Sequence, residues 1–198
     1  MSRTFRSRVT TGQGDDGHSR SLSGFVVPKH HALMDATGWV DTLRAHTAEA
    51  RLMLIAERPA LWERLDQELF WLLHCYFLVG AAVSDPHDKH PEYRPAEIGA
   101  EHLARLEAVQ AELEAGLELP RAFIVSATTP LAAKLDTTAT YARTLERALS
   151  ALREAEPAFR AEHILRFINR LSDFLYVLAR HCEGGQHLPV DYGVLQSE

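Results

Sequence analysis

The sequence predicts an all-α protein: a five-helix bundle of long up-down antiparallel helices, preceded by a flexible N-terminal loop. Apolar residues recur at helical spacing along most of the chain, and proline or glycine marks the ends of these segments. Alternation typical of strands is absent apart from a short piece at residues 24–27. Long helices with short connections pack as antiparallel neighbours, so a bundle is expected.

Five helical segments are expected, at residues 30–57, 59–84, 96–117, 130–154 and 157–182. Proline suits the first turn of a helix, which places helix starts at Pro59 and Pro157. Thr129 is the expected N-cap of the fourth helix, with Pro130 at its first position. The fifth helix is expected to end near Cys182, because two glycines follow.

Apolar stripes support the last two helices most strongly. In the fourth, positions separated by four and three residues form one face: Leu131, Leu135, Thr138, Ala142, Leu145, Leu149 and Leu152. In the fifth, a wide stripe is formed by Ile164, Phe167, Ile168, Leu171, Leu175 and Leu178. Both helices are therefore expected to bury one face in the bundle.

The chain divides into three parts by composition. Residues 1–27 are rich in Gly, Ser, Thr, Arg and Asp without an apolar period, so they are expected to form an N-terminal arm, either a loop or a flexible tail. Residues 28–184 form the helical bundle domain, and residues 185–198 a C-terminal tail. The 198 residues, 46% of them hydrophobic, suffice for a full core without disulfides.

Composition excludes several classes of function. The chain has 21 Lys+Arg against 27 Asp+Glu and a net charge of −6, so no basic balance indicates nucleic acid. The longest apolar stretch, around residues 69–83, is interrupted by His74 and is too short for a membrane span. Two cysteines form no disulfide framework, which favours a reducing compartment. We therefore expect a cytoplasmic protein without nucleic-acid or membrane partners.

Histidine is abundant, with 11 residues. The sequence nevertheless contains no HExxH, no CxxC and no Glu-x-x-His pair repeated on two helices. No resident metal centre is therefore expected.

Two polar clusters are candidates for ligand binding. Residues 14–19 read GDDGHS; glycines allow close backbone approach, and successive N–H groups bind phosphate oxygens, but the same composition is common in plain loops. Arg143, Glu146 and Arg147 lie within about one helical turn and suit a triphosphate, although a solvated charged face has the same spacing. Asn169 lies at the edge of the last stripe and needs a partner in the core or a ligand.

Four stretches, taken in chain order, resemble one known family. They are TGQGDDGHS at 11–19, PKHHALMDATGWVDTL at 28–43, FIVSAT at 123–128 followed by YARTLERAL at 141–149, and INRLSDFLYVLAR at 168–180. Together they resemble the PduO-type ATP:cob(I)alamin (corrinoid) adenosyltransferases over roughly residues 10–182. The last stretch is the most specific of the four.

The resemblance implies a five-helix bundle that forms a homotrimer, with active sites between subunits. It implies an enzyme that transfers the adenosyl group of ATP to the cobalt of a reduced corrinoid and releases triphosphate. ATP, Mg²⁺ and cobalamin are the ligands expected on this basis. The physical requirements are proximity of the reactants and neutralisation of the leaving triphosphate.

The resemblance also assigns residues. The ATP loop would comprise Thr11, Gly14, Asp15, Gly17, His18 and Ser19, with Lys29 near the phosphates. Arg143, Glu146 and Arg147 would form the triphosphate side, and Asn169 would reach the nucleotide. Phe123 would fill the lower face of the corrinoid, and Asp41 would be a buried aspartate near it. Arg143, Asp41 and Phe123 are thus the expected catalytic residues.

The chain departs from the family pattern at several positions. Gly12, Ala139 and Thr144 stand where the pattern has cations, and Thr42 and Arg44 replace the Glu and Asn that follow the aspartate. Each lost charge-assisted contact is worth about 1.5–3 kcal/mol. An alternative is therefore a degenerate or repurposed member that binds a corrinoid, another tetrapyrrole or a nucleotide without adenosyl transfer. A scaffold without a ligand is a third possibility.

Overall fold

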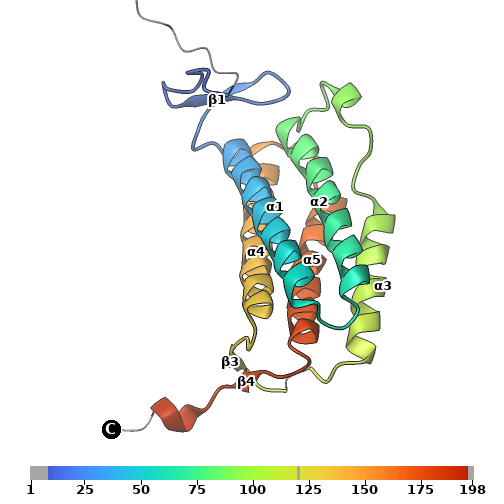
Figure 1. The fold of residues 1–198 in the computed structure, drawn as a ribbon. Helices are drawn as coiled ribbons and strands as arrows, with labels where there is room; N and C mark the ends of the chain where they lie inside the picture. The colour runs from blue at the N-terminus through green and yellow to red at the C-terminus, as the bar shows by residue number, and fades with distance from the viewer. Residues whose placement is uncertain (1–8, 120, 196–198) are drawn as a thin grey trace, which may run out of the picture.

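The structure is a computed structural model that describes residues 9–119 and 121–195. Five helices lie side by side along one direction (Figure 1). They are α1 (Ala32–Glu57), α2 (Trp62–Ser84), α3 (Ala100–Ala115), α4 (Pro130–Ala155) and α5 (Glu162–Cys182). Two 3-10 turns, η1 (Pro91–Tyr93) and η2 (Tyr192–Leu195), complete the helical part. The predicted five-helix bundle is confirmed.

The apolar stripes of α4 and α5 form the centre of the bundle. Every residue of the two predicted stripes is buried. α5 packs against both α4 and α3, while α1 packs against both α4 and α2. The α4–α5 contact is therefore the one around which the other helices are arranged.

The predicted start of α4 is confirmed, but those of α2 and α5 are wrong. Thr129 Oγ1 accepts a hydrogen bond from the N–H of Ala132 at 3.1 Å, as an N-cap does. Pro59 instead lies in the turn after α1, and α2 begins at Trp62. Pro157 likewise lies in a turn, four residues before the N-cap Ala161. Proline's fixed φ suits such turns as well as a first helical turn.

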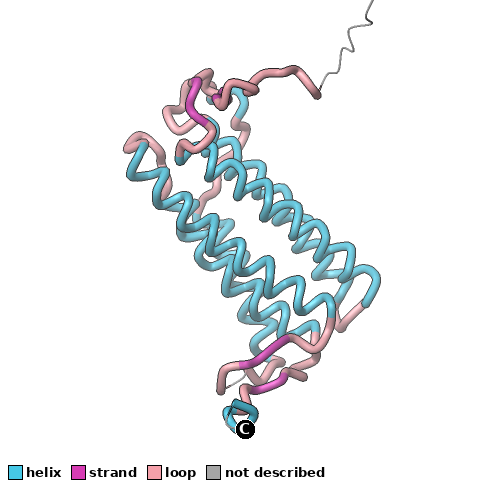
Figure 2. The backbone as a smooth tube through the Cα atoms, turned by 90° about the vertical axis from the view of Figure 1, so that its left-hand side faces the viewer, coloured by secondary structure: helices cyan, strands magenta, loops and turns pink. Residues whose placement is uncertain are grey.

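The N-terminal arm contains a β-hairpin, where the sequence predicted a flexible loop. β1 (His18–Arg20) pairs antiparallel with β2 (Val26–Pro28). The turn between them closes because the N–H of Ser21 donates to the Phe25 carbonyl at 2.8 Å. The hairpin lies at the end of the bundle where α1 begins (Figures 1 and 2).

A second small sheet lies at the other end of the bundle (Figure 2). β3 (Ile124–Ser126) precedes α4 and pairs antiparallel with β4 (Leu188–Pro189), which follows α5. α4 spans 26 residues, or about 39 Å, so the two sheets are far apart.

α2 has the length and apolar composition of a membrane span, the one such helix among the described residues. Its buried residues include Leu65, Leu69, Leu72 and Val79, and they belong to the bundle core. The expectation from the sequence that the protein has no membrane partner is not tested by this observation and stays a prediction.

A buried charge cluster joins α4 to the end of α5. The side chain of Arg180 is 0% exposed and binds Asp136 at 2.7 Å and Glu183 at 2.6 Å. Burial disfavours its charge, but the hydrogen bond and charge of Asp136 outweigh burial and raise the pKa of Arg180. The other oxygen of Glu183 accepts the N–H of Thr128 at 3.0 Å. The cluster therefore also holds the connection between β3 and α4.

We predict that Arg180→Met lowers the free energy of unfolding by about 3–5 kcal/mol, because two acids are left without their buried cation. Chemical denaturation measures this loss. The matched control is Arg170→Met, whose ion pairs with Glu107 and Asp173 lie at the surface and are worth about 1 kcal/mol or less. Equal losses in the two variants would contradict the prediction.

Candidate functional site

The glycine loop of the arm closes around Lys29. Gly14 and Gly17 adopt positive φ values of 91° and 84°, and the N–H of Gly17 donates to the Gly14 carbonyl at 3.1 Å. The N–H of Lys29 donates to the Gly17 carbonyl at 2.9 Å. A Cβ placed on Gly14 would lie 3.4 Å from Lys29 Nζ and 2.8 Å from the His18 carbonyl oxygen. The backbone of Lys29 is thus bonded to the loop, and its side chain lies beside Gly14.

A shallow cavity of about 400 Å³ lies on this loop. Its lining comprises Thr11, Gln13, Gly14, Asp16, His18, Ser19, Arg20 and Val26. Four of these were expected from the sequence, whereas Asp15, Gly17 and Lys29 lie outside the lining. Sequence reasoning missed Arg20, which shares a strand face with His18; recognition of the hairpin would have revealed it.

The hairpin is held on the bundle by specific contacts. Ser23 Oγ donates to the Ser84 carbonyl at 3.1 Å, at the end of α2. The Phe25 ring lies 5.1 Å from the His87 ring, and Lys89 Nζ lies 3.8 Å from the centre of the Phe25 ring. The arm therefore rests on α2 and on the loop that follows it.

This supporting loop is itself fixed by Asp85. The buried carboxylate accepts backbone N–H groups from Lys89 at 3.0 Å and His90 at 2.7 Å. Burial by itself would raise the pKa of Asp85, but these hydrogen bonds outweigh it and lower the pKa. The ionised Asp85 carboxylate therefore stabilises the folded chain fully above the ordinary carboxyl pKa. This stabilisation is lost as the pH falls through the lowered pKa of Asp85 in the folded state.

The polar residues predicted on α4 and α5 lie together. Asn169 Nδ2 donates to Glu146 Oε1 at 3.0 Å, so Glu146 is the partner that Asn169 required. Arg147 donates to the Thr144 hydroxyl at 3.0 Å. Arg143 is exposed and has no hydrogen-bond or ion-pair partner among residues 9–119 and 121–195. This cluster therefore presents two guanidiniums on an outer face of the bundle.

Asp41 was expected to be buried, and this is wrong. Its side chain is 66% exposed and pairs with Arg44 at 3.3 Å. Val40 and Leu43 occupy the buried face of α1, so helical rotation turns Asp41 outward, along a groove of about 420 Å³ between α1 and α2. Ala139 is 5% exposed, so packing occupies the position where the family pattern has an arginine.

Phe123 lies at the opposite end of the bundle from the glycine loop. Its side chain is 80% exposed, next to β3, and the exposed Val125 and Leu188 extend the apolar surface. Asp41, Arg143 and Phe123 thus lie on three separate surfaces, and no contact or cavity of the described residues joins them. One chain does not assemble the predicted catalytic set.

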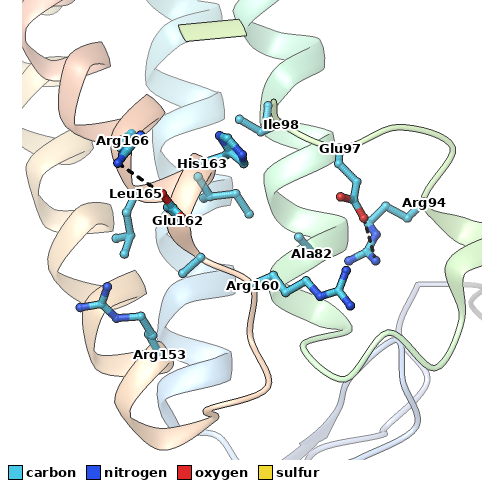
Figure 3. A pocket seen from close by; sticks show the side chains of 12 residues that line it. Ala82, Arg94, Glu97, Ile98, Arg153, Arg160, Glu162, His163, Leu165 and Arg166 are labelled. Atoms are coloured by element: carbon cyan, nitrogen blue, oxygen red, sulfur yellow. Dashed lines mark ion pairs between the residues drawn. The ribbon is translucent and has the colours of Figure 1, made fainter. Parts of the chain in front are cut away.

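A larger cavity, about 800 Å³, lies at the start of α5 and contains none of the predicted residues (Figure 3). Two of its arginines are already paired, Arg94 with Glu97 at 3.0 Å and Arg166 with Glu162 at 3.2 Å. The other two, Arg153 and Arg160, point to opposite sides of the first turn of α5 (Figure 3).

In the described part of the chain, neither a group of metal-binding side chains nor a reactive thiol is present. Within it, no three His, Cys, Asp or Glu side chains are grouped to hold a metal ion. Cys75 and Cys182 are buried, and burial raises the pKa of each thiol to about 12. Neither cysteine is suited to act as a nucleophile.

Comparison with known proteins defines the class. The family model described as cobalamin adenosyltransferase matches residues 9–182, and the chain belongs to this family. It is 31% identical over 180 residues to corrinoid adenosyltransferase PduO of Salmonella typhimurium, covering 90% of this chain and 51% of that protein. It is 28% identical over 174 residues to a corrinoid adenosyltransferase of Mycobacterium tuberculosis H37Rv, covering 88% of each.

The chain spans about half the length of the PduO relatives that it matches. Its fold is similar to that of a variant PduO-type ATP:corrinoid adenosyltransferase from Lactobacillus reuteri complexed with cobalamin and ATP. The TM-score is 0.81 at 22% identity, covering 92% of this chain and 99% of the other. The resemblance inferred from the motifs is therefore confirmed at the level of family and fold.

We predict that Gly14→Ala loosens the glycine loop more than Gly17→Ala does. Both positions have positive φ, which costs about 1 kcal/mol or more for alanine. A Cβ at Gly14 also collides with the His18 carbonyl, whereas a Cβ at Gly17 meets open space. Amide hydrogen exchange of residues 11–31 measures the effect, and equal exchange in the two variants would contradict the prediction.

Proposed function

We propose that this chain transfers the adenosyl group of ATP to the cobalt of a reduced corrinoid and releases triphosphate. The observation that carries this proposal is the glycine loop closed around Lys29, in a chain that matches the family over residues 9–182. Backbone N–H groups in a glycine loop, next to an ammonium, suit a polyphosphate.

The nucleotide would be bound by two groups of residues. The loop residues are Thr11, Gly14, Asp15, Gly17, His18 and Ser19, together with Lys29. Arg143 and Arg147 would face the triphosphate, and the Glu146–Asn169 pair would contact the nucleoside. Magnesium in such sites is held mainly by phosphate oxygens and water, with one or two carboxylates. We propose that Mg²⁺ arrives with ATP, and Asp15 and Asp16 are the carboxylates that the loop offers.

The reaction is a displacement at carbon. The reduced cobalt supplies an electron pair to the ribose C5′, the C5′–O5′ bond breaks, and that bond's electron pair leaves with the triphosphate. The protein must hold the two reactants together and neutralise charge on the leaving oxygen. Lys29, Arg143 and Arg147 are the cations proposed for the second task. Phe123 is proposed to lie against the lower face of the corrinoid.

The site is proposed to lie between subunits of a homotrimer. Asp41, Arg143 and Phe123 occupy separate surfaces of one chain, so neighbouring copies would have to supply the missing side of each site. This supports an inter-subunit arrangement, as the family resemblance implies. We place the protein in the cytoplasm, in keeping with its two unpaired cysteines.

The alternative is a repurposed member that binds a corrinoid, another tetrapyrrole or a nucleotide without adenosyl transfer. Two observations favour it. Ala139 is packed where the family pattern has an arginine, and Arg44 pairs with Asp41 within the chain. Separate titrations with ATP and with cobalamin distinguish the two functions, because the alternative requires that one ligand binds without the reaction.

We predict that the chain converts cob(I)alamin with Mg-ATP under anaerobic conditions, followed by the corrinoid spectrum. Arg143→Ala should lower kcat/KM for ATP by about 10- to 100-fold, since a charge-assisted contact is lost. The matched control is Arg166→Ala, whose partner Glu162 lies on the same helix. Cobalamin binding by the unmodified chain without any conversion at millimolar ATP would support the alternative.

We predict that Phe123→Ala weakens cobalamin binding at least about tenfold while the free energy of unfolding changes by about 0.5 kcal/mol or less. The ring is exposed in the single chain, so its removal leaves no cavity in the core. An absorbance titration and chemical denaturation provide the two measurements. The control is Leu52→Ala, because Leu52 is also an exposed apolar residue but lies on α1. Unchanged cobalamin affinity would remove Phe123 from the site.

A further inference from the structure

Glu156 lies where three parts of the chain meet. It is the C-cap of α4, and its carboxylate accepts a hydrogen bond from His87 Nε2 at 2.9 Å, in the loop after α2. Its other oxygen lies 4.0 Å from Nε2 of His31, which precedes α1. The Glu156 side chain is 23% exposed, and both histidines are partly screened from water. One carboxylate thus lies against two loops that are more than 50 residues apart in the sequence.

The His31 ring has a defined orientation. Its Nδ1 accepts the N–H of Leu33 at 3.2 Å, so this side chain is the N-cap of α1. In the neutral ring the proton is then on Nε2, the nitrogen that faces Glu156. At 4.0 Å the carboxylate forms no hydrogen bond with Nε2, but its negative charge favours the tautomer that carries the proton there, and with it the cap. Glu156 therefore supports the first turn of α1 through His31.

Both contacts lead to the glycine loop. His31 follows two residues after Lys29, whose N–H donates to the Gly17 carbonyl and whose side chain lies beside Gly14. His87 is the ring on which Phe25 of the hairpin rests, at 5.1 Å. Glu156 thus touches the support of the hairpin and the residue that follows the glycine loop and Lys29, although it lies on a different element and is absent from the lining of the cavities at the glycine loop, at the start of α5 and beside His87.

We propose that Glu156 is a positioning residue for the nucleotide loop. It holds residues 9–31 in the conformation that binds ATP, by anchoring His31 and His87 at the same time. The inference rests on the proposed function for its ligand, but the anchoring itself is a property of the chain. It also assigns a role to two of the 11 histidines.

The first test is amide hydrogen exchange without ligand. Glu156→Ala should speed exchange in residues 9–31 by about tenfold or more and leave residues 168–180 of α5 unchanged, because it removes a charge-assisted hydrogen bond. Glu156→Gln keeps a hydrogen-bonding oxygen, so its exchange rate in residues 9–31 should lie between those of the unmodified chain and Glu156→Ala. The matched control is Glu154→Ala, on an exposed side chain two residues away. Equal exchange in Glu156→Ala and Glu154→Ala would overturn the inference.

The second test separates this role from a general loss of stability. Glu156→Ala should raise the KM for ATP about tenfold, with partial rescue by Glu156→Gln, while kcat and the KM for cobalamin stay within about twofold. Equal changes in all three constants would overturn the inference. If the unmodified chain transfers no adenosyl group, the proposed function fails, and the exchange measurement still decides the role of Glu156.

Discussion

The buried guanidinium of Arg180 is the constraint on which the rest of the structure depends. A buried cation must be met by acids, so Asp136 of α4 and Glu183 beyond α5 are held against it. This contact sets both the rotation and the axial position of α4 against α5. The Glu146–Asn169 pair lies ten residues after Asp136 along α4, or about 15 Å, and eleven residues before Arg180 along α5, or about 16.5 Å. The two distances agree, so one antiparallel register satisfies both pairs.

The sequence predicted those elements whose signals are local. The stripes of α4 and α5, the Thr129 cap and the need of Asn169 for a partner all follow from residues within a turn or two of one another. The hairpin of the arm has only a weak local signal, the strand-like alternation at residues 24–27 that overlaps β2. It depends on the Ser21 turn and on the support of Phe25 by His87, more than 60 residues away. Periodicity alone does not report contacts of that range.

The candidate site likewise contains residues that local spacing predicts and residues whose orientation depends on helix packing. The glycine loop and the Arg143–Glu146–Arg147 cluster were predicted because spacing alone brings their members together. The orientation of Asp41 was not, because it depends on how α1 is rotated against its neighbours, and Val40 and Leu43 turn it outward. Arg44, a departure from the family pattern, then supplies the countercharge on the same helix.

Charge balance makes assembly decisive for the proposed reaction. Within one chain, Lys29 contacts the glycine loop, while Arg143 and Arg147 lie on an outer face of α4. A triphosphate in the loop of an isolated chain would therefore meet the ammonium of Lys29 and the guanidinium of Arg20, and the cations missing at Gly12, Ala139 and Thr144 would not be replaced. If a second copy brings its α4 against this loop, two guanidiniums join the ammonium and the leaving group is neutralised. The proposed reaction would thus require contact between copies of the chain.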